Sequence, residues 1–202
     1  MPPMLWLPNP PEGAAIGAGF DGSENDDWSA LRCETLDGFQ FTPRYGPDRR
    51  PAIWNPAEWG GRIPRGEVHA AVAEMFETWS VARFYADPLD WRSEIGDWSL
   101  AYGEEHVSEW ATNRVTPMYF AIKRFETDLA TRRIRQDGCP IAAQHIGNAR
   151  KVPKPGDKYV LGKPAQHQKI DTAIASILAH EAASDAREAG WEDIDSRMWS
   201  MS

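Results

Sequence analysis

The alternation of apolar and polar residues near the start of the chain predicts three successive β-strands. The first covers residues 14–21, a run of small and apolar side chains with Pro and Gly before it and Gly-Ser after it. The second covers residues 29–36, where apolar and charged residues alternate. Asp37-Gly38 is a strong hairpin turn, and the alternation resumes at 39–41. We therefore expect three antiparallel strands.

Helical spacing of apolar residues then alternates with shorter strand patterns. The predicted elements are, in order, a loop at 43–65, a helix at 66–79, a strand at 80–87, a helix at 88–102, a strand at 106–110 and a helix at 116–135. Residues 141–148 fit a short helix or a strand equally well. A basic β-hairpin is expected around 153–157, and a last amphipathic helix from about 166 to 188.

This order of elements predicts an α/β domain with a ribonuclease H-like fold. Its mixed five-stranded sheet would contain three antiparallel strands and then parallel strands, flanked by helices, with a C-terminal β-hairpin. A helix that leads from the third strand to a strand beside the first is a crossover connection. We expect a Pro-rich linker or arm at 1–13, the ribonuclease H-like domain at 14–189 and a loose tail at 190–202.

Three aspartates fall where such a fold would bring them together. Asp21 ends the first strand, Asp87 ends the strand expected beside it, and Asp171 lies in the first turn of the last helix. Mg²⁺ and Mn²⁺ prefer oxygen ligands and use few carboxylates. Two such ions can activate a water and stabilise the leaving oxygen of a phosphodiester. We expect all three aspartates to be catalytic metal ligands, with Asp21 bridging both ions.

Each aspartate alone has a simpler explanation. An Asp before Gly is common in turns, and an Asp in a first helical turn complements the helix dipole. The joint placement on three elements of one fold is what favours a metal site. Glu24, Asp26 and Asp27 could add a water-mediated ligand, although a solvated loop is the preferred reading. His145 is interpreted as a hydrogen-bonded structural residue, with a proton carrier as the alternative.

The formal net charge of −8 does not suggest a general nucleic-acid-binding surface, but one segment is strongly basic. The segment 150–169 contains six cationic residues and only one acidic residue, Asp157. We expect them to contact DNA phosphates, with a solvated edge as an equal alternative for the hairpin. These cationic residues are Arg150, Lys151, Lys154, Lys158, Lys163 and Lys169.

The two cysteines lie far apart in the sequence and form no Cys-x-x-Cys pair, which favours a reducing compartment. No stretch has the apolar length of a membrane span, and the N-terminal residues lack the features of a signal peptide. The histidines have no zinc-binding spacing. We therefore expect a protein that is not secreted and does not bind membranes.

Five short motifs lie along the chain: Gly-Phe-Asp-Gly-Ser at 19–23, Tyr-Ala-Asp-Pro-Leu-Asp-Trp at 85–91, Glu-Trp-Ala-Thr-Asn at 109–113, His-Ile-Gly-Asn-Ala at 145–149 and Lys-Ile-Asp-Thr-Ala-Ile-Ala at 169–175. Together, and in this order, they resemble the nuclease domain of tailed-bacteriophage large terminase subunits. The resemblance covers residues from about 14 to 189. The resemblance implies a two-metal endonuclease that cuts concatemeric double-stranded viral DNA, with Asp21, Asp87 and Asp171 as ligands.

The same resemblance implies further partners and a location. The expected partners are double-stranded DNA, a packaging ATPase domain, a portal and a small terminase subunit, in the cytoplasm of an infected bacterial host. No Gly-x-x-x-x-Gly-Lys-Ser/Thr motif is present, so the sequence predicts a nuclease domain without ATPase activity in this chain.

Two alternatives stay open at this stage. The chain could be another ribonuclease H-like nuclease, such as a junction resolvase or an exonuclease. It could also be a non-catalytic docking module of a packaging motor. Metal binding separates the second alternative from a nuclease, because a docking module has no need of Mn²⁺.

Overall fold

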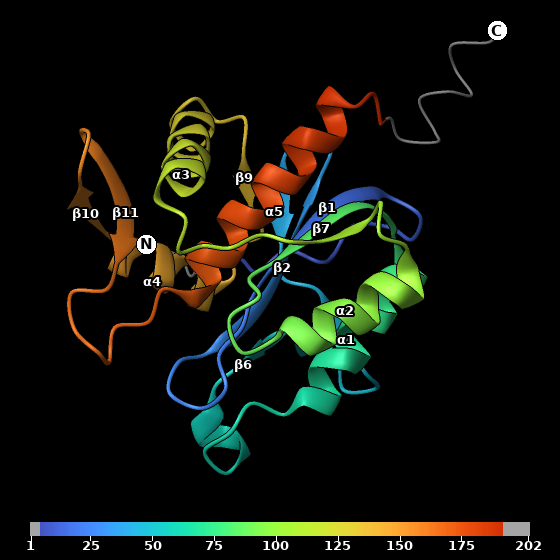
Figure 1. Ribbon diagram of the computed structural model, residues 1–202. Coiled ribbons are helices and arrows are strands. Elements are labelled where there is room, and N and C mark those ends of the chain that lie inside the picture. The colour runs from blue at the N-terminus through green and yellow to red at the C-terminus, as the bar shows by residue number, and fades with distance from the viewer. Residues whose placement is uncertain (1–4, 192–202) are drawn as a thin grey trace, which may run out of the picture.

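A mixed β-sheet with helices on both faces forms the centre of the computed structural model, which describes residues 5–191 (Figure 1). The strands are β1 (Ala15–Asp21), β2 (Ser29–Thr35), β3 (Phe39–Phe41), β4 (Arg44–Tyr45), β5 (Arg50–Pro51), β6 (Ile53–Trp54), β7 (Ser80–Ala86), β8 (Val107–Glu109), β9 (Arg135–Gln136), β10 (Arg150–Lys154) and β11 (Lys158–Gly162). The helices are α1 (Arg65–Thr78), α2 (Arg92–Tyr102), α3 (Val115–Ala130), α4 (Pro140–Asn148) and α5 (Asp171–Glu188), with a 3-10 turn, η1, at Pro56–Trp59.

The strand order of the central sheet is β8-β7-β1-β2-β3-β9, and β6 pairs with the first two residues of β2. Strands β1, β2 and β3 are antiparallel, whereas β7 lies parallel to β1 and β8 parallel to β7. This arrangement confirms the predicted ribonuclease H-like fold and the separate β10–β11 hairpin. The sheet has seven strands where five were predicted, because β6 and β9 are two residues long and too short to produce a periodic pattern.

Four other sequence predictions differ from the structure. The helix predicted from residue 88 begins at Arg92, because Asp90 has a left-handed φ of 60°. The expected loop at 43–65 contains β4, β5, β6 and η1, each too short to show a period. The helix predicted to reach residue 135 ends at Ala130, because Arg132 has a left-handed φ of 60° and the chain then pairs as β9 with β3. The last helix begins at Asp171 and not near 166, whereas the undecided segment 141–148 is helical.

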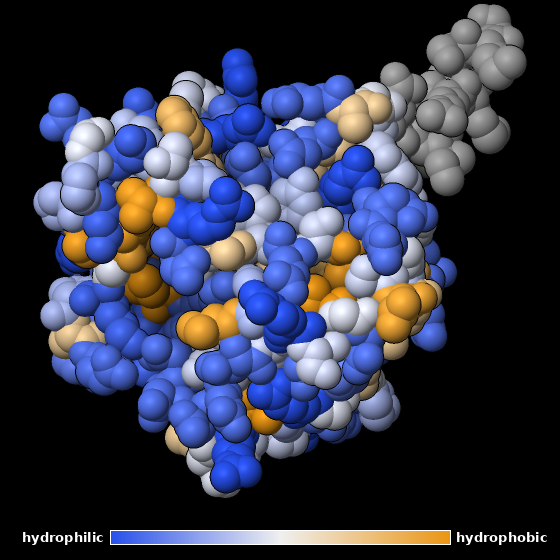
Figure 2. Space-filling model, in the orientation of Figure 1, coloured by the Kyte–Doolittle hydropathy of each residue, from blue (hydrophilic) through white to orange (hydrophobic). Residues whose placement is uncertain are grey.

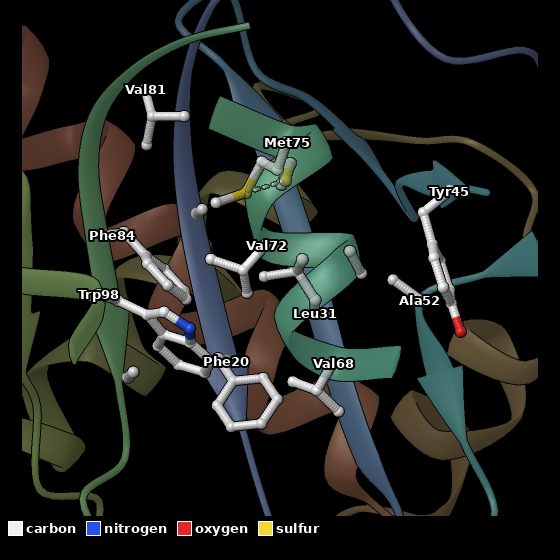
Figure 3. Packing of buried hydrophobic residues seen from close by; sticks show 14 of the residues in the cluster. Phe20, Leu31, Tyr45, Ala52, Val68, Val72, Met75, Val81, Phe84 and Trp98 are labelled. Carbon is white, nitrogen blue, oxygen red and sulfur yellow. Dashed lines mark hydrogen bonds between the residues drawn. The ribbon is translucent and has the colours of Figure 1, made fainter. Parts of the chain in front are cut away.

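The two faces of strand β1 carry different side chains. Ile16, Ala18 and Phe20 point to one face and join an apolar core with α1 and α2. Figure 3 shows part of this core, in which Phe20, Phe84 and Trp98 lie close together near Val68 and Val72 of α1. The large aromatic and branched side chains on this face supply most of the hydrophobic burial.

The opposite face of β1 is built for close approach of a helix. A Cβ added at Gly19 would lie 2.2 Å from the carbonyl oxygen of Ala175, and one at Gly17 would lie 2.3 Å from the backbone nitrogen of Ala183. Both neighbours belong to α5, whose exposed face is small and whose residues are mostly buried. Neither glycine has a positive φ, so space and not backbone conformation requires glycine here. The predicted small-residue strand thus determines how closely α5 packs.

The segment before β1 lies against the domain. Leu7 donates its backbone N–H to the carbonyl of Asp137 at 2.7 Å, and the indole of Trp79 donates to the carbonyl of Pro10 at 3.3 Å. Two residues of the segment predicted as a linker or arm thus contact the domain, whereas the predicted tail at 190–202 falls almost entirely outside the described residues. On the face drawn in Figure 2 the surface is mostly hydrophilic, with hydrophobic residues in separate small groups. Within residues 5–191, no helix is both long enough and apolar enough to cross a membrane.

Candidate metal centre

The pairing of β1 with β7 brings the first two predicted ligands to one edge of the sheet. Phe20 lies opposite Ala86 in the parallel register, and the next backbone N–H, that of Asp87, donates to the carbonyl of Phe20 at 3.0 Å. Asp21 and Asp87 are therefore neighbours at the carboxyl ends of adjacent strands, where α/β folds collect their ligands.

Side-chain parity places both carboxylates on the same face. Along β1 the residues that alternate with the apolar core are Gly17, Gly19 and Asp21, and the first two pack against α5. Along β7 the hydroxyl of Tyr85 donates to Asp185 of α5 at 2.6 Å, so Asp87, two residues later, lies on this face as well. The α5 face of the sheet therefore carries both aspartates.

Helix α5 begins at the same edge with Asp171 as its first residue. Asp171 is 7% exposed and Asp87 6% exposed, while Asp21 is partly buried. All three aspartates line one cavity of about 340 Å³. The predicted convergence of three carboxylates that are distant in sequence thus occurs at one cavity.

The remaining cavity wall is mainly apolar. The β10–β11 hairpin contributes Val160 and Leu161, helix α3 contributes Met118, and α5 with its preceding residue contributes Ile170 and Ile174. An apolar wall lowers the local dielectric and strengthens electrostatic interactions among the carboxylates and with any bound cation. The hairpin is therefore a structural part of the cavity.

Burial and repulsion from neighbouring carboxylates disfavour ionisation of Asp21 and Asp171. The pKa of Asp21 is raised well above its ordinary value by burial first and then by the charges of Asp171, Asp87 and Asp27. Burial also raises the pKa of Asp171 to about 6, against the lowering effect of its own backbone N–H. A carboxylate cluster of this kind is stabilised in its ionised form by a bound cation.

The hydrogen bonds of the cluster leave one buried carboxylate oxygen without a partner among the described residues. Asp87 accepts from the hydroxyl of Thr112 at 2.5 Å and from the backbone N–H of Leu89 at 3.4 Å. Oδ2 of Asp171 is buried and has no hydrogen-bond partner in residues 5–191. Across the same residues, no group of three or more His, Cys, Asp or Glu side chains is already arranged to hold a metal ion. The three aspartates share a cavity without forming a closed ligand cluster.

Asp27 was assigned to a solvated loop, and the structure corrects this. Its Oδ1 accepts from Nζ of Lys163 at 2.5 Å and from Nζ of Lys169 at 2.6 Å. Burial raises the pKa of Asp27, but these two hydrogen bonds outweigh it and hold the pKa below its ordinary value. Glu24 and Asp26 are exposed as expected. Sequence distance concealed the pairing, because more than 130 residues separate Asp27 from each lysine.

The six basic residues predicted to bind DNA divide into two groups. Lys163 lines the cavity, and Lys169 lies close to it through Asp27. The other four belong to the hairpin: Arg150, Lys151, Lys154 and Lys158. Lys151 pairs with Glu126 of α3 at 2.9 Å, so part of the hairpin charge is already neutralised within the protein.

Several residues around the site were not predicted from the sequence. Thr112 donates a hydrogen bond to Asp87 from the loop after β8; it lies in the motif at 109–113, but the motif did not indicate this role. Gly22 lies so close to the rings of Phe20 and Trp91 that an added Cβ would approach both to 2.5 Å. The indole of Trp91 also donates to the carbonyl of Ser23 at 3.1 Å, which fixes the chain just after Asp21.

Comparison with known proteins gives two kinds of relative. No family model matches the sequence. The Gene 13 protein of Mycobacterium phage D29 is 31% identical in an alignment of 185 residues that covers 86% of this chain and 30% of that protein. The Gene 13 protein of Mycobacterium phage L5 is 30% identical in an alignment of the same length and coverage. The chain thus spans about 30% of the length of these curated relatives.

The similar solved structures are more informative about the fold. The large terminase of bacteriophage HK97 superimposes with a TM-score of 0.66 at 16% identity, over 90% of this chain and 41% of that chain. The large terminase nuclease of thermophilic phage G20c gives a TM-score of 0.64 at 11% identity, over 88% of this chain and 93% of that chain. A second structure of the G20c nuclease, with bound magnesium, gives 0.61 at 14% identity, over 88% and 92% of the two chains. The resemblance inferred from the sequence is therefore confirmed for the fold: this chain has the fold of large terminase nuclease domains.

Proposed function

We propose that this chain is a metal-dependent DNA endonuclease that cuts concatemeric double-stranded DNA during viral genome packaging, by a two-metal mechanism. The observation that carries the proposal is the meeting of Asp21, Asp87 and Asp171, from three elements, at one cavity. Likeness to terminase nucleases supports the same conclusion, and one of those structures contains magnesium.

The residues present suit a hard divalent cation. The donor set consists of carboxylate oxygens, which Mg²⁺ and Mn²⁺ prefer. Oδ2 of Asp171 is buried with no hydrogen-bond partner among residues 5–191, as an atom kept for a ligand would be. We infer that Asp21, Asp87 and Asp171 would hold two ions. Bound ions would activate a water and stabilise the leaving oxygen of the phosphodiester.

The protein's own residues position these carboxylates and the substrate. Thr112 restrains Asp87 by a hydrogen bond to one carboxylate oxygen, and the other oxygen accepts only the longer 3.4 Å bond from the backbone N–H of Leu89. Lys163 and Lys169 hold their charges beside the carboxylates and are proposed to contact phosphates of the cut strand. The hairpin residues Arg150, Lys151, Lys154 and Lys158 are proposed to lie along the duplex backbone.

The proposed partners follow from the terminase likeness. They are double-stranded DNA, a packaging ATPase, a portal and a small terminase subunit. The proposed location is the cytoplasm of an infected bacterial cell. A packaging ATPase would supply much of the DNA affinity, because the net charge of this chain is −8 and favours only local contact with DNA.

The test is cleavage of supercoiled plasmid by the purified chain with Mg²⁺ or Mn²⁺. We expect nicked and linear products, and we expect Asp21→Asn and Asp171→Asn each to lower the rate at least about 100-fold, as loss of an essential catalytic group does. Asp90→Asn is the matched control: Asp90 lines the same cavity, undergoes the same change of charge, and has a left-handed φ of 60° that Asn also tolerates.

Full activity in either Asp21→Asn or Asp171→Asn would contradict the assignment. Parallel assays on branched DNA, linear ends and an RNA–DNA hybrid distinguish a terminase nuclease from a resolvase, an exonuclease or a ribonuclease H. Calorimetric titration with Mn²⁺ tests the docking-module alternative, for which no heat of metal binding is expected.

A further inference from the structure

Helix α5 begins without a cap of its own. The residue before its first turn is Ile170, whose side chain cannot accept a hydrogen bond. The first backbone N–H groups of a helix have no partner within the helix, and they are usually satisfied by Ser, Thr, Asp or Asn at the cap position. In α5 the N–H groups of Ala173 and Ile174 donate to the carbonyl of Ile170, whereas the N–H of Thr172, the residue after the proposed metal ligand Asp171, needs an acceptor from outside the helix.

Another helix supplies the missing acceptor. The backbone N–H of Thr172 donates to Nδ1 of His145 in α4 at 3.2 Å, in a fully buried contact. The imidazole of His145 is 3% exposed and lies edge-on to Trp28, with ring centroids 5.2 Å apart. Burial lowers the pKa of His145 to about 4, so that the ring is neutral at pH 7 and one nitrogen can accept.

Helix α4 also fixes the chain just before α5. The side-chain amide of Asn148 donates to the backbone carbonyl of Lys169 at 2.9 Å. His145 and Asn148 lie one turn apart on α4, and their two hydrogen bonds bracket Asp171 in the sequence. Figure 1 shows α4 beside the beginning of α5. The backbone on both sides of the aspartate is therefore held by one neighbouring helix.

We propose that His145 is a positioning residue, which caps α5 from α4 and thereby holds Asp171 in place for metal binding. This inference rests on the proposed function. The bond specifies the tautomer, because Nδ1 must be unprotonated to accept and the proton must therefore reside on Nε2. Removing partners that orient a ligand typically weakens metal binding about 10- to 100-fold.

A matched pair of variants isolates the acceptor. His145→Asn keeps an oxygen near the position of Nδ1, whereas His145→Leu has nearly the shape of Asn without an acceptor, and both lose the ring contact with Trp28. By calorimetry we expect Mn²⁺ to bind the Leu variant about 10- to 100-fold more weakly than the wild type. The Asn variant should recover most of that loss. In plasmid cleavage, kcat should fall in the Leu variant while KM for DNA stays unchanged.

Two measurements on the wild type test the cap itself. Long-range ¹H–¹⁵N correlation should show His145 protonated on Nε2 and not on Nδ1. Amide exchange should show Thr172 protected, and exchange should become at least about 10-fold faster in the Leu variant, as loss of one buried hydrogen bond allows. Protonation on Nδ1, or equal Mn²⁺ affinity in the Asn and Leu variants, would overturn the proposal.

The two failures can be told apart. If the wild type neither binds Mn²⁺ nor cuts DNA, the proposed function fails, and the tautomer and the exchange of Thr172 still show whether His145 caps the helix. If the wild type binds and cuts but the Leu variant does so equally well, only the positioning role fails. Should the Leu variant not fold, the wild-type tautomer decides.

Discussion

The two faces of the central sheet are built by different means. The face under α1 and α2 is filled with large apolar side chains, among them Phe20, Phe84 and Trp98. The face under α5 combines glycines with buried polar residues. Those with no measurable exposure include Arg32, Glu34 and Gln40. Strand β2 is fully buried on both faces, so burial alone does not explain the difference.

The polar face fixes the position of one helix. Arg32 donates to the hydroxyl of Ser176 at 3.1 Å, and Gln40 donates to the carbonyl of Ser176 at 2.9 Å. Glu34 and Asp128 hold the two ring nitrogens of His180 at 2.9 and 3.1 Å. Apolar contacts tolerate sliding, whereas directional hydrogen bonds allow one register. We infer that this face sets where α5 begins, and so where Asp171 lies.

The largest effect is expected at the closest approach between β1 and α5. Gly19→Ala would force a Cβ to within 2.2 Å of the α5 backbone, and backbone atoms cannot move aside as side chains do. We expect the free energy of unfolding in urea to fall by more than about 3 kcal/mol, or the domain not to fold.

The control is a glycine without such a neighbour. Gly96 lies inside α2 with nothing within 4 Å of an added Cβ. Gly96→Ala should stabilise the domain by about 0.5–1 kcal/mol, because alanine favours a helix. A small effect at Gly19 would mean that α5 moves away easily and that the register argument is wrong.

The second prediction compares the loss of stability caused by one shape-conserving substitution on each face of the sheet. Asp137 is fully buried; its carboxylate accepts from Arg32 at 3.3 Å and from the backbone N–H of Thr42 at 2.7 Å. Asp137→Asn leaves the charge of Arg32 buried and unpaired, and should cost about 3–5 kcal/mol. Leu31→Met, on the apolar face, should cost less than about 1.5 kcal/mol. Denaturation by urea gives both values, and equal costs would remove the distinction between the faces.

The sequence predicted the apolar face better than the polar one. In β1, β2 and α1 the apolar side chains lie on one face of the element, and this produces the alternation and the helical spacing seen in the sequence. The strand order and α1 were therefore correctly predicted. Nothing in the local sequence singles out Asp137, because a buried ion pair with Arg32, 105 positions away, leaves no local pattern. The same holds for Asp27 with its two lysines and for His145 with Thr172.

The candidate site was predictable to the extent that it follows from topology. Asp21 and Asp87 end neighbouring strands, and this follows from the strand order alone. Asp171 was correctly placed in the first turn of α5, although that helix begins later than predicted. The groups that orient these residues come from loops and from α4, for which the sequence allowed a helix or a strand.

A third prediction concerns the loss of folding stability that ionised carboxylates cause at the α5 face of the sheet when no metal is bound. The pKa of Asp171 is about 6 in the folded chain, against an ordinary value of 3.8. The folded state therefore binds the extra proton between these values, and the stabilising contribution is present below pH 3.8 and lost as the pH rises through 6. At about 1.36 kcal/mol per pH unit the difference amounts to roughly 3 kcal/mol.

The measurement is thermal unfolding of the wild type and Asp171→Asn in EDTA at pH 4 and pH 7.5. The two proteins should be similarly stable at pH 4, and the Asn variant should be the more stable at pH 7.5. Saturating Mn²⁺ should stabilise only the wild type, because the variant lacks a ligand. A variant that is less stable than the wild type at both pH values would show that Asp171 is held by contacts that favour its ionised form.

The smallest effect is expected where an ion pair similar to Arg32–Asp137 is exposed to solvent. Glu126 accepts from Lys151 at 3.0 Å and from the hydroxyl of Tyr159 at 2.7 Å, joining the β10–β11 hairpin to α3. Both charged side chains are substantially exposed, and water satisfies either group when its partner is lost. Glu126→Gln should therefore change the free energy of unfolding by at most about 1 kcal/mol, with the difference shrinking further in high salt.

Asp137→Asn makes the same change of one charge in a fully buried site, so the ratio of the two costs measures what burial adds to an ion pair in this fold. A cost for Glu126→Gln as large as that for Asp137→Asn would mean that the hairpin is a rigid part of the domain, held to α3 as firmly as α5 is held to the sheet.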